Sequence, residues 1–184
     1  MFDITRLVSE ELPAYTPEER FTREALCTVE RDRYNLTRFT MSAHCGTHMD
    51  APAHFIAGGK TIDQIPLELL AGPALVFTVG EDEDFAGVPD GTLRLIMRGC
   101  RGLTAPQAET LIKKGVRLIG TDAISVGPAD NEMQIHLILL GNDAWILENV
   151  CLDGVSDGEY ELICLPMKLQ GVEGAPARAL LRRV

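Results

Sequence analysis

The sequence has little positive charge and no long apolar run. Its 184 residues include 27 acidic side chains against 17 lysines and arginines, so the formal net charge is −10 at pH 7. Nucleic-acid binding requires concentrated positive charge, and no cluster of lysine or arginine is present, so no nucleic-acid partner is expected. The most apolar stretch, residues 69–79, is shorter than a membrane span and contains Gly72 and Pro73, which excludes a spanning helix there.

Cysteines are few, and their spacing is not that of a metal or redox motif. The five cysteines are an odd number without a C-x-x-C pair, which is typical of reduced thiols in a cytoplasmic protein. They are Cys27, Cys45, Cys100, Cys151 and Cys164. Residues 1–6 do not combine a basic region with an apolar run, so we expect no secretory signal and a cytoplasmic location.

Hydrophobic patterning predicts several strands within one domain that spans residues 1–184. A hydrophobic content of 46% with 24% charged residues is that of an ordinary globular protein, and no repeat or linker divides the chain. Loops are expected at residues 13–19 and at the acidic run 81–84. Strands are predicted at residues 1–9, 34–43, 74–79, 93–97, 116–120 and 160–165.

The clearest helix signal begins at Thr104. Thr104 and Gln107 have the spacing of a capping box, Pro106 lies in the first turn, and Gly115 is a natural end. A strand is predicted on each side of this helix. The order strand–helix–strand favours an α/β or α+β fold over a helix bundle.

Three of the four histidines, His44, His48 and His54, lie within eleven residues together with Asp50. Imidazole and carboxylate groups are ligands that suit zinc or a similar divalent ion. In a strand, residues 44, 48 and 50 point to the same face, whereas the glycine at position 46 opposes a helix. The spacing therefore predicts a metal site on a strand.

A flat strand would hold these ligands too far apart. Four residues at about 3.3 Å each separate His44 from His48 by roughly 13 Å, which no single ion can span. The chain must therefore bend between them, and Gly46 is the residue that permits the bend. Pro52 ends the strand and redirects His54. Cys45 lies on the opposite face and is expected to be a buried filler, although a nucleophilic Cys45–histidine pair stays open.

The fourth histidine and a distant glutamate are weaker candidates. His136 lies in an apolar segment, where a structural imidazole is the common case. Glu148 ends the apolar run 144–147, and a carboxylate at the end of a buried strand is costly unless it is paired or binds a metal. The sequence alone does not show whether either residue meets the first cluster.

Taken together, these motifs resemble the metal-dependent cyclase-like hydrolases. The chain carries H-x-G-T-H-x-D-x-P-x-H at residues 44–54, H-x-x-L-L-G from His136, and Glu148 followed by Asn149. This family includes bacterial kynurenine formamidase (arylformamidase) and isatin hydrolase. The resemblance covers nearly the whole chain and includes the matches at residues 3–5, 103–104, 120–126, 165–168 and 174–178.

The resemblance implies a role for each matching residue. His44, His48 and Asp50 match the first metal ligands, and Asp50 also bridges to a second ion in dinuclear members. His136 matches a ligand of the second ion, and Glu148 matches the bridge between both. The implied cofactor is one or two divalent ions per chain, with zinc as the default for this ligand set and manganese also suited to it.

The same resemblance extends to the fold, the proton transfer and the assembly. It implies a single compact domain with a mixed, largely antiparallel β core and flanking helices, of the swivelling β/β/α-like type. His54 matches the proton donor and acceptor. The family also forms homo-oligomers, so a dimer or a dimer of dimers is expected.

One departure concerns the substrate. Formamidases carry a tryptophan in a P-x-W sequence of the N-terminal loop, whereas this chain has Pro13, Ala14 and Tyr15 there. Tyr15 is the expected substrate-binding aromatic, since it can stack on an aryl ring; an exposed loop tyrosine is the alternative. The substitution keeps another amide, lactam or lactone open as the substrate.

The expected function is a metal-dependent hydrolase that uses metal-activated water to cleave a small amide-type bond. The activity that the resemblance favours is that of arylformamidase, which converts N-formylkynurenine to kynurenine and formate in tryptophan catabolism. The alternatives are an isatin-hydrolase-like lactam or lactone hydrolase, a cyclase, or a catalytically silent metal-stabilised binding protein. A serine hydrolase is disfavoured because no G-x-S-x-G is present.

Overall fold

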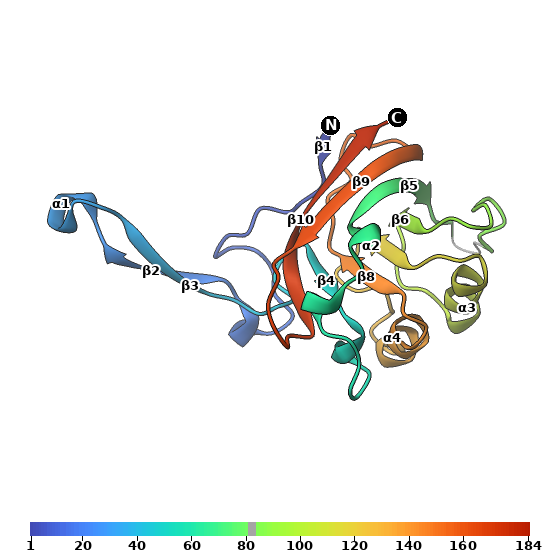
Figure 1. Cartoon of the computed structure of the whole chain (residues 1–184), viewed down its shortest axis with the longest axis horizontal. Coiled ribbons are helices and arrows are strands. Elements are labelled where there is room, and N and C mark those ends of the chain that lie inside the picture. The colour runs from blue at the N-terminus through green and yellow to red at the C-terminus, as the bar shows by residue number, and fades with distance from the viewer. Residues whose placement is uncertain (81–83) are drawn as a thin grey trace.

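The chain builds its core from one large sheet, in a computed structural model that describes residues 1–80 and 84–184 (Figure 1). The strands are β1 (Phe2–Asp3), β2 (Thr22–Cys27), β3 (Leu36–Thr40), β4 (His48–Asp50), β5 (Ala71–Thr78), β6 (Arg94–Arg98), β7 (Leu118–Thr121), β8 (Trp145–Glu148), β9 (Gly158–Pro166) and β10 (Gly174–Arg183). The helices are α1 (Val29–Asp32), α2 (Leu67–Leu70), α3 (Ala105–Lys113) and α4 (Glu132–Gly141), with 3₁₀ turns at Pro17–Glu19, Pro52–His54 and Ile62–Gln64.

The large sheet has the strand order β1-β10-β4-β8-β7-β6-β5-β9, and β9 also pairs with β10. This extra pairing closes the sheet into a barrel-like ring. The neighbours β5–β6, β6–β7 and β7–β8 are parallel, whereas the other pairs of this sheet are antiparallel. The predicted mixed, largely antiparallel core is confirmed.

The parallel strands are buried on both faces, as their apolar sequences require. Along β6, Ile96 packs inside the barrel, while Leu95 and Met97 pack against the helices on the outer face. The same alternation along β8 places Trp145 and Leu147 inside. Helices α3 and α4 lie together against the outer face (Figure 1), so the protein is a single compact domain with flanking helices.

The predicted helix at residue 104 is confirmed in detail. Thr104 and Gln107 form both halves of the capping box of α3, and Gly115 beyond its end has a φ of +93°. Strands β5, β6, β7 and β9 fall on the predicted runs. The strand predicted at residues 1–9 is shorter, because only β1 pairs. In the acidic run, residues 81–83 lie outside the described part of the chain.

A hairpin leaves the body of the domain. Strands β2 and β3 pair with each other in a separate two-stranded sheet. They extend away from the barrel, with α1 at the tip (Figure 1). Every residue of β3 is exposed, so the alternation at residues 34–43 predicted a strand correctly but not its position.

Among the described residues, no helix is long and apolar enough to cross a membrane.

Candidate metal centre and substrate pocket

The backbone bends where the sequence requires it. Strand β4 begins only at His48, and Gly46 before it has a φ of +65°. A Cβ at position 46 would lie 3.0 Å from a methyl of Val8, so a larger residue is unfavourable for space as well as for φ. The bend brings the ring centroids of His44 and His48 to 5.0 Å. The predicted bend at Gly46 is confirmed.

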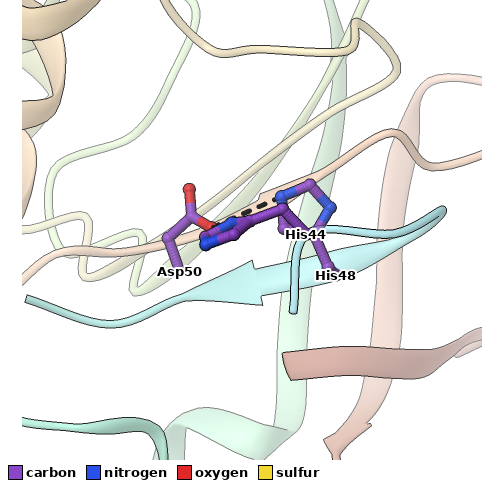
Figure 2. A group of neighbouring side chains, drawn as sticks. All are labelled: His44, His48 and Asp50. Atoms are coloured by element: carbon purple, nitrogen blue, oxygen red, sulfur yellow. Dashed lines mark hydrogen bonds and ion pairs between the residues drawn. The ribbon is translucent and has the colours of Figure 1, made fainter. Parts of the chain in front are cut away.

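Pairing between β4 and β8 joins the two distant parts of the motif. In the antiparallel register His48 lies opposite Glu148, so both side chains point to the same face of the sheet. His48 Nε2 is 3.5 Å from Glu148 Oε2 and 3.4 Å from Asp50 Oδ1. The segment before β4 contributes His44, whose Nδ1 is 2.9 Å from the same Asp50 oxygen. Figure 2 shows His44, His48 and Asp50 turned toward one another.

Helix α4 adds the fourth histidine from the opposite side. His136 Nε2 is 3.6 Å from Asp50 Oδ2 and 3.5 Å from Glu148 Oε1. Each carboxylate therefore presents one oxygen to His48 and the other to His136. The structure thus brings His136 and Glu148 to the cluster at residues 44–50, which the sequence left undecided.

Backbone carbonyls fix the orientation of two imidazoles. His48 Nδ1 is 2.9 Å from the carbonyl oxygen of Gly46, and His136 Nδ1 is 2.9 Å from that of Glu132. A carbonyl only accepts, so both Nδ1 atoms carry the proton and both Nε2 atoms point at the carboxylates. His44 is reversed, since its Nδ1 points to Asp50 and its Nε2 lies 3.4 Å from Glu173 Oε1. Such outer contacts are the means by which proteins orient metal-binding histidines.

The site is buried and strongly polarised. Asp50 is fully buried, which acts to raise its pKa, but the nearby imidazoles of His136, His44 and His48 hold the pKa of this carboxyl well below its usual value. Burial acts to lower the pKa of His136, and the carboxylates of Asp50 and Glu148 outweigh it and raise that pKa to about 10. The metal-free site is therefore a set of imidazolium–carboxylate pairs.

The donor set fits a divalent cation. Ligand atoms of His44, His48 and Asp50 lie within 4.8 Å of one another, as do those of Asp50, His54 and His136. Among the described residues, Asp50 Oδ2 and His44 Nε2 are buried without a hydrogen-bond partner. Their ion-pair contacts are long, 3.6 Å to His136 Nε2 and 3.4 Å to Glu173 Oε1. Burial of a polar atom without a hydrogen bond is costly, and a cation held between these nitrogen and oxygen donors would reduce that cost.

His54 lies on the 3₁₀ turn Pro52–His54 at the edge of this cluster. Its ring stacks on His44 with a centroid distance of 4.2 Å and lies 5.8 Å from the His136 ring. Burial lowers the pKa of His54, in contrast to the other three histidines. The imidazole is therefore neutral at pH 7, the form that accepts a proton. His54 also lies close enough to Asp50 and His136 to bind a metal ion with them. Its assignment to proton transfer therefore stays a prediction.

A cavity of about 230 Å³ opens above the cluster. All four histidines and Glu148 line it at the bottom, and Tyr15, Phe21 and Phe55 provide aromatic walls. A concave, mostly apolar space with a few converging polar groups is typical of small-molecule sites. The predicted substrate residue, Tyr15, lies on this cavity, and its hydroxyl donates to Glu132 Oε2 at 2.9 Å.

Two residues shape the site without a role predicted for them: Phe55 carried no sequence signal, and Thr47 is part of the motif at residues 44–54. Phe55 stacks on the His136 ring at 4.5 Å. Thr47 is 2% exposed, and its hydroxyl accepts a hydrogen bond from the backbone N–H of Arg6 at 2.9 Å and donates to the carbonyl of Asn149 at 2.7 Å. Thr47 precedes His48 and Asn149 follows Glu148, so this hydroxyl ties the two ligand-bearing strands together.

Comparison with known proteins identifies the family. The model of the Cyclase family matches residues 2–94. The kynurenine formamidase of Bacillus cytotoxicus is 38% identical over 98% of this chain and 96% of the relative, and that of Maricaulis maris is 35% identical over 100% and 98%. The chain belongs to the Cyclase family. The resemblance read from residues 44–54 is thereby confirmed.

Solved structures of other proteins agree with the fold. A "predicted metal-dependent hydrolase" from Bacillus stearothermophilus superposes with a TM-score of 0.83 at 28% identity, over 98% of this chain and 96% of that chain. Isatin hydrolase A from Ralstonia solanacearum gives a TM-score of 0.80 at 22% identity, over 98% and 90%. At that identity the second likeness shows the fold alone.

Proposed function

We propose that the protein is a metal-dependent hydrolase of a small non-peptide amide, and that it acts as an arylformamidase on N-formylkynurenine. The observation that carries the proposal is the pair of carboxylates, Asp50 and Glu148, each shared between His48 and His136. Glu148 and both histidines line an aromatic-walled cavity. The full-length similarity to proteins named kynurenine formamidase supports the choice of substrate.

Two groups of side chains would hold the cofactor. His44, His48, Asp50 and Glu148 would bind a cation on one side, and Asp50, Glu148 and His136 would bind one on the other. The donors are nitrogen and carboxylate oxygen, which favours zinc and also suits manganese. A bound divalent cation polarises a carbonyl oxygen and makes a neighbouring water molecule more acidic.

His54 would carry the proton through the reaction. As a neutral imidazole it accepts a proton from the attacking water, whose oxygen adds to the carbonyl carbon of the formamide. When the carbon–nitrogen bond breaks, His54 returns the proton to the leaving aryl nitrogen, so the products are formate and the free aromatic amine. Tyr15 and Phe21 would contact the aryl ring, since both line the cavity above the histidines.

Cysteine chemistry is a poor alternative at this site. Cys45 lines the cavity, but it is 7% exposed, and burial raises the pKa of its thiol. A reactive cysteine requires the opposite shift, because the thiolate is the nucleophile. The hydrolase proposal therefore uses no covalent step.

We propose further that the protein is a cytoplasmic homo-oligomer, with a dimer as its smallest unit. Val29, Tyr34, Leu36 and Phe39 on the hairpin are between 46% and 56% exposed, an apolar set that a second copy of the chain would cover. The five cysteines are free thiols, as a reducing compartment maintains them.

The decisive assay follows kynurenine release from N-formylkynurenine by the metal-loaded protein, before and after treatment with a chelator. We expect turnover that chelation abolishes and metal restores. Isatin and a simple lactone are assayed in parallel. Turnover of these two without turnover of the formamide would favour a lactam or lactone hydrolase, and metal-loaded protein inert on all three would favour a binding protein.

A further inference from the structure

The mouth of the cavity carries acidic groups that the hydrolysis itself does not use. Glu19 and Glu132 line the cavity together with Glu148, whereas no lysine or arginine among the described residues does so. A cation bound at the bottom would neutralise Glu148 and Asp50. The other two carboxylates, Glu19 and Glu132, are not among the proposed metal ligands, so they stay available to a group of the substrate.

Glu132 is held in place relative to the histidines. It is the first residue of α4, and its backbone carbonyl accepts the hydrogen bond from His136 Nδ1. Its carboxylate accepts the hydroxyl of Tyr15 through Oε2 at 2.9 Å. Within the described part of the chain, the Glu132 carboxylate forms no ion pair with a lysine or arginine. A fixed carboxylate on the wall of a substrate cavity, with no cation of its own, is placed to bind a cationic group of a ligand.

The pKa of the Tyr15 hydroxyl indicates the sign of the electrostatic potential in this part of the cavity. Its pKa is raised above the ordinary value, first by the hydrogen bond to Glu132 and then by the charges of Glu132, Glu19 and Glu148. Glu148 would bind the cation, so Glu132 and Glu19 are the carboxylates that remain to act at this point of the cavity. Such a field attracts a positive group and repels a negative one.

We propose that Glu132 is a specificity-determining residue, and that its carboxylate binds a primary ammonium group on the part of the substrate remote from the scissile amide. The preferred substrate is then an aryl amide with an ammonium-bearing side chain, rather than a neutral amide, lactam or lactone. This inference rests on the proposed function and adds to it the residue that selects among amides. Tyr15 serves as the support that fixes the carboxylate.

The test compares one charge change on two substrates. Glu132→Gln keeps the backbone carbonyl for His136 and an acceptor oxygen for Tyr15, and removes only the charge. N-formylkynurenine carries an ammonium group and a carboxylate on its side chain, and its deamino analogue 4-(2-formamidophenyl)-4-oxobutanoate keeps the formanilide core and the carboxylate without the ammonium group. We expect kcat/KM of Glu132→Gln to fall about tenfold on N-formylkynurenine, mainly through KM, and not to fall by more than about twofold on the deamino analogue. Glu18→Gln, an exposed carboxylate outside the cavity, should change neither value.

An equal loss of kcat/KM on both substrates, or no loss on either, overturns the inference. The proposed function is unaffected by that result as long as the wild-type protein hydrolyses N-formylkynurenine. Wild-type protein inactive on both formamides would contradict the proposed function instead. A second measurement needs no variant. Raising NaCl from about 0.05 M to about 0.5 M should raise KM for N-formylkynurenine and should not raise KM for the deamino analogue. Equal salt dependence for the two amides would also overturn the inference.

Discussion

Thr47 offers a sharp test of how the two ligand-bearing strands are held. Its buried hydroxyl satisfies the N–H of Arg6 and the carbonyl of Asn149. Thr47→Val keeps the shape of the side chain and removes both hydrogen bonds. Each orphaned backbone group costs about 1–3 kcal/mol, so we expect the loss of both partners to lower the free energy of unfolding by about 2–6 kcal/mol.

The matched control is Thr47→Ser, which keeps the hydroxyl and loses one methyl group at a cost of about 1 kcal/mol. Urea unfolding of the metal-free variants gives both values from their midpoints. Because the hydroxyl links the residues beside His48 and Glu148, Thr47→Val should also weaken metal binding by about 10–100-fold, the usual effect of losing an outer contact. A Thr47→Val variant as stable as Thr47→Ser would refute this reasoning.

Three other predictions concern the histidines and the hairpin. His54→Ala should retain bound metal and lose turnover, whereas His48→Ala should lose the metal. Elemental analysis measures the bound metal, and kynurenine release measures turnover. Equal loss of metal in the two variants would contradict this division of roles. The pKa of His136 is raised to about 10 in the folded protein, so its contribution to stability is complete below its unfolded pKa of about 6.5 and is lost as pH rises through 10. The Tm of the metal-free protein should thus fall over that range, and fall less in His136→Asn; parallel profiles would count against it. Phe39→Glu on the hairpin should shift the protein toward monomers in light scattering, and an unchanged mass would remove Phe39 from the interface.

The local part of the site could be predicted from the sequence because its geometry is local. Residues 44–54 contain their own bend at Gly46, and the distance that His44 and His48 must cross follows from strand geometry alone. The helix at Thr104 was equally accessible, since a capping box is a short-range signal. No information from elsewhere in the chain was needed for either.

The meeting of His136 and Glu148 with the first cluster depends on long-range order. It requires the register between β4 and β8 and the packing of α4 against the sheet, neither of which a single sequence encodes locally. Helix α4 is apolar on nearly all sides, so its pattern lacks the period that separates a helix from a buried strand. The hydrogen bond between Tyr15 and Glu132 joins the N-terminal loop to the first residue of α4, 117 residues away, so it could not be predicted from local sequence either.

The position of the hairpin was hidden for a related reason. Alternation at residues 34–43 reports that the strand has two unlike faces, but not what covers either face. Every residue of β3 is exposed, although the Phe39 ring contacts the Phe21 ring at a centroid distance of 6.0 Å. These exposed apolar residues are the surface that we propose a second copy covers.

The measurement that tests the account most directly is a metal titration of chelated protein that records bound ions and N-formylkynurenine hydrolysis together. Asp50 and Glu148 each present one oxygen to His48 and the other to His136. This arrangement predicts no activity without metal, and activity that reaches a plateau at two divalent ions per chain. Full activity in the chelated protein, or metal saturation without any release of kynurenine, would contradict it.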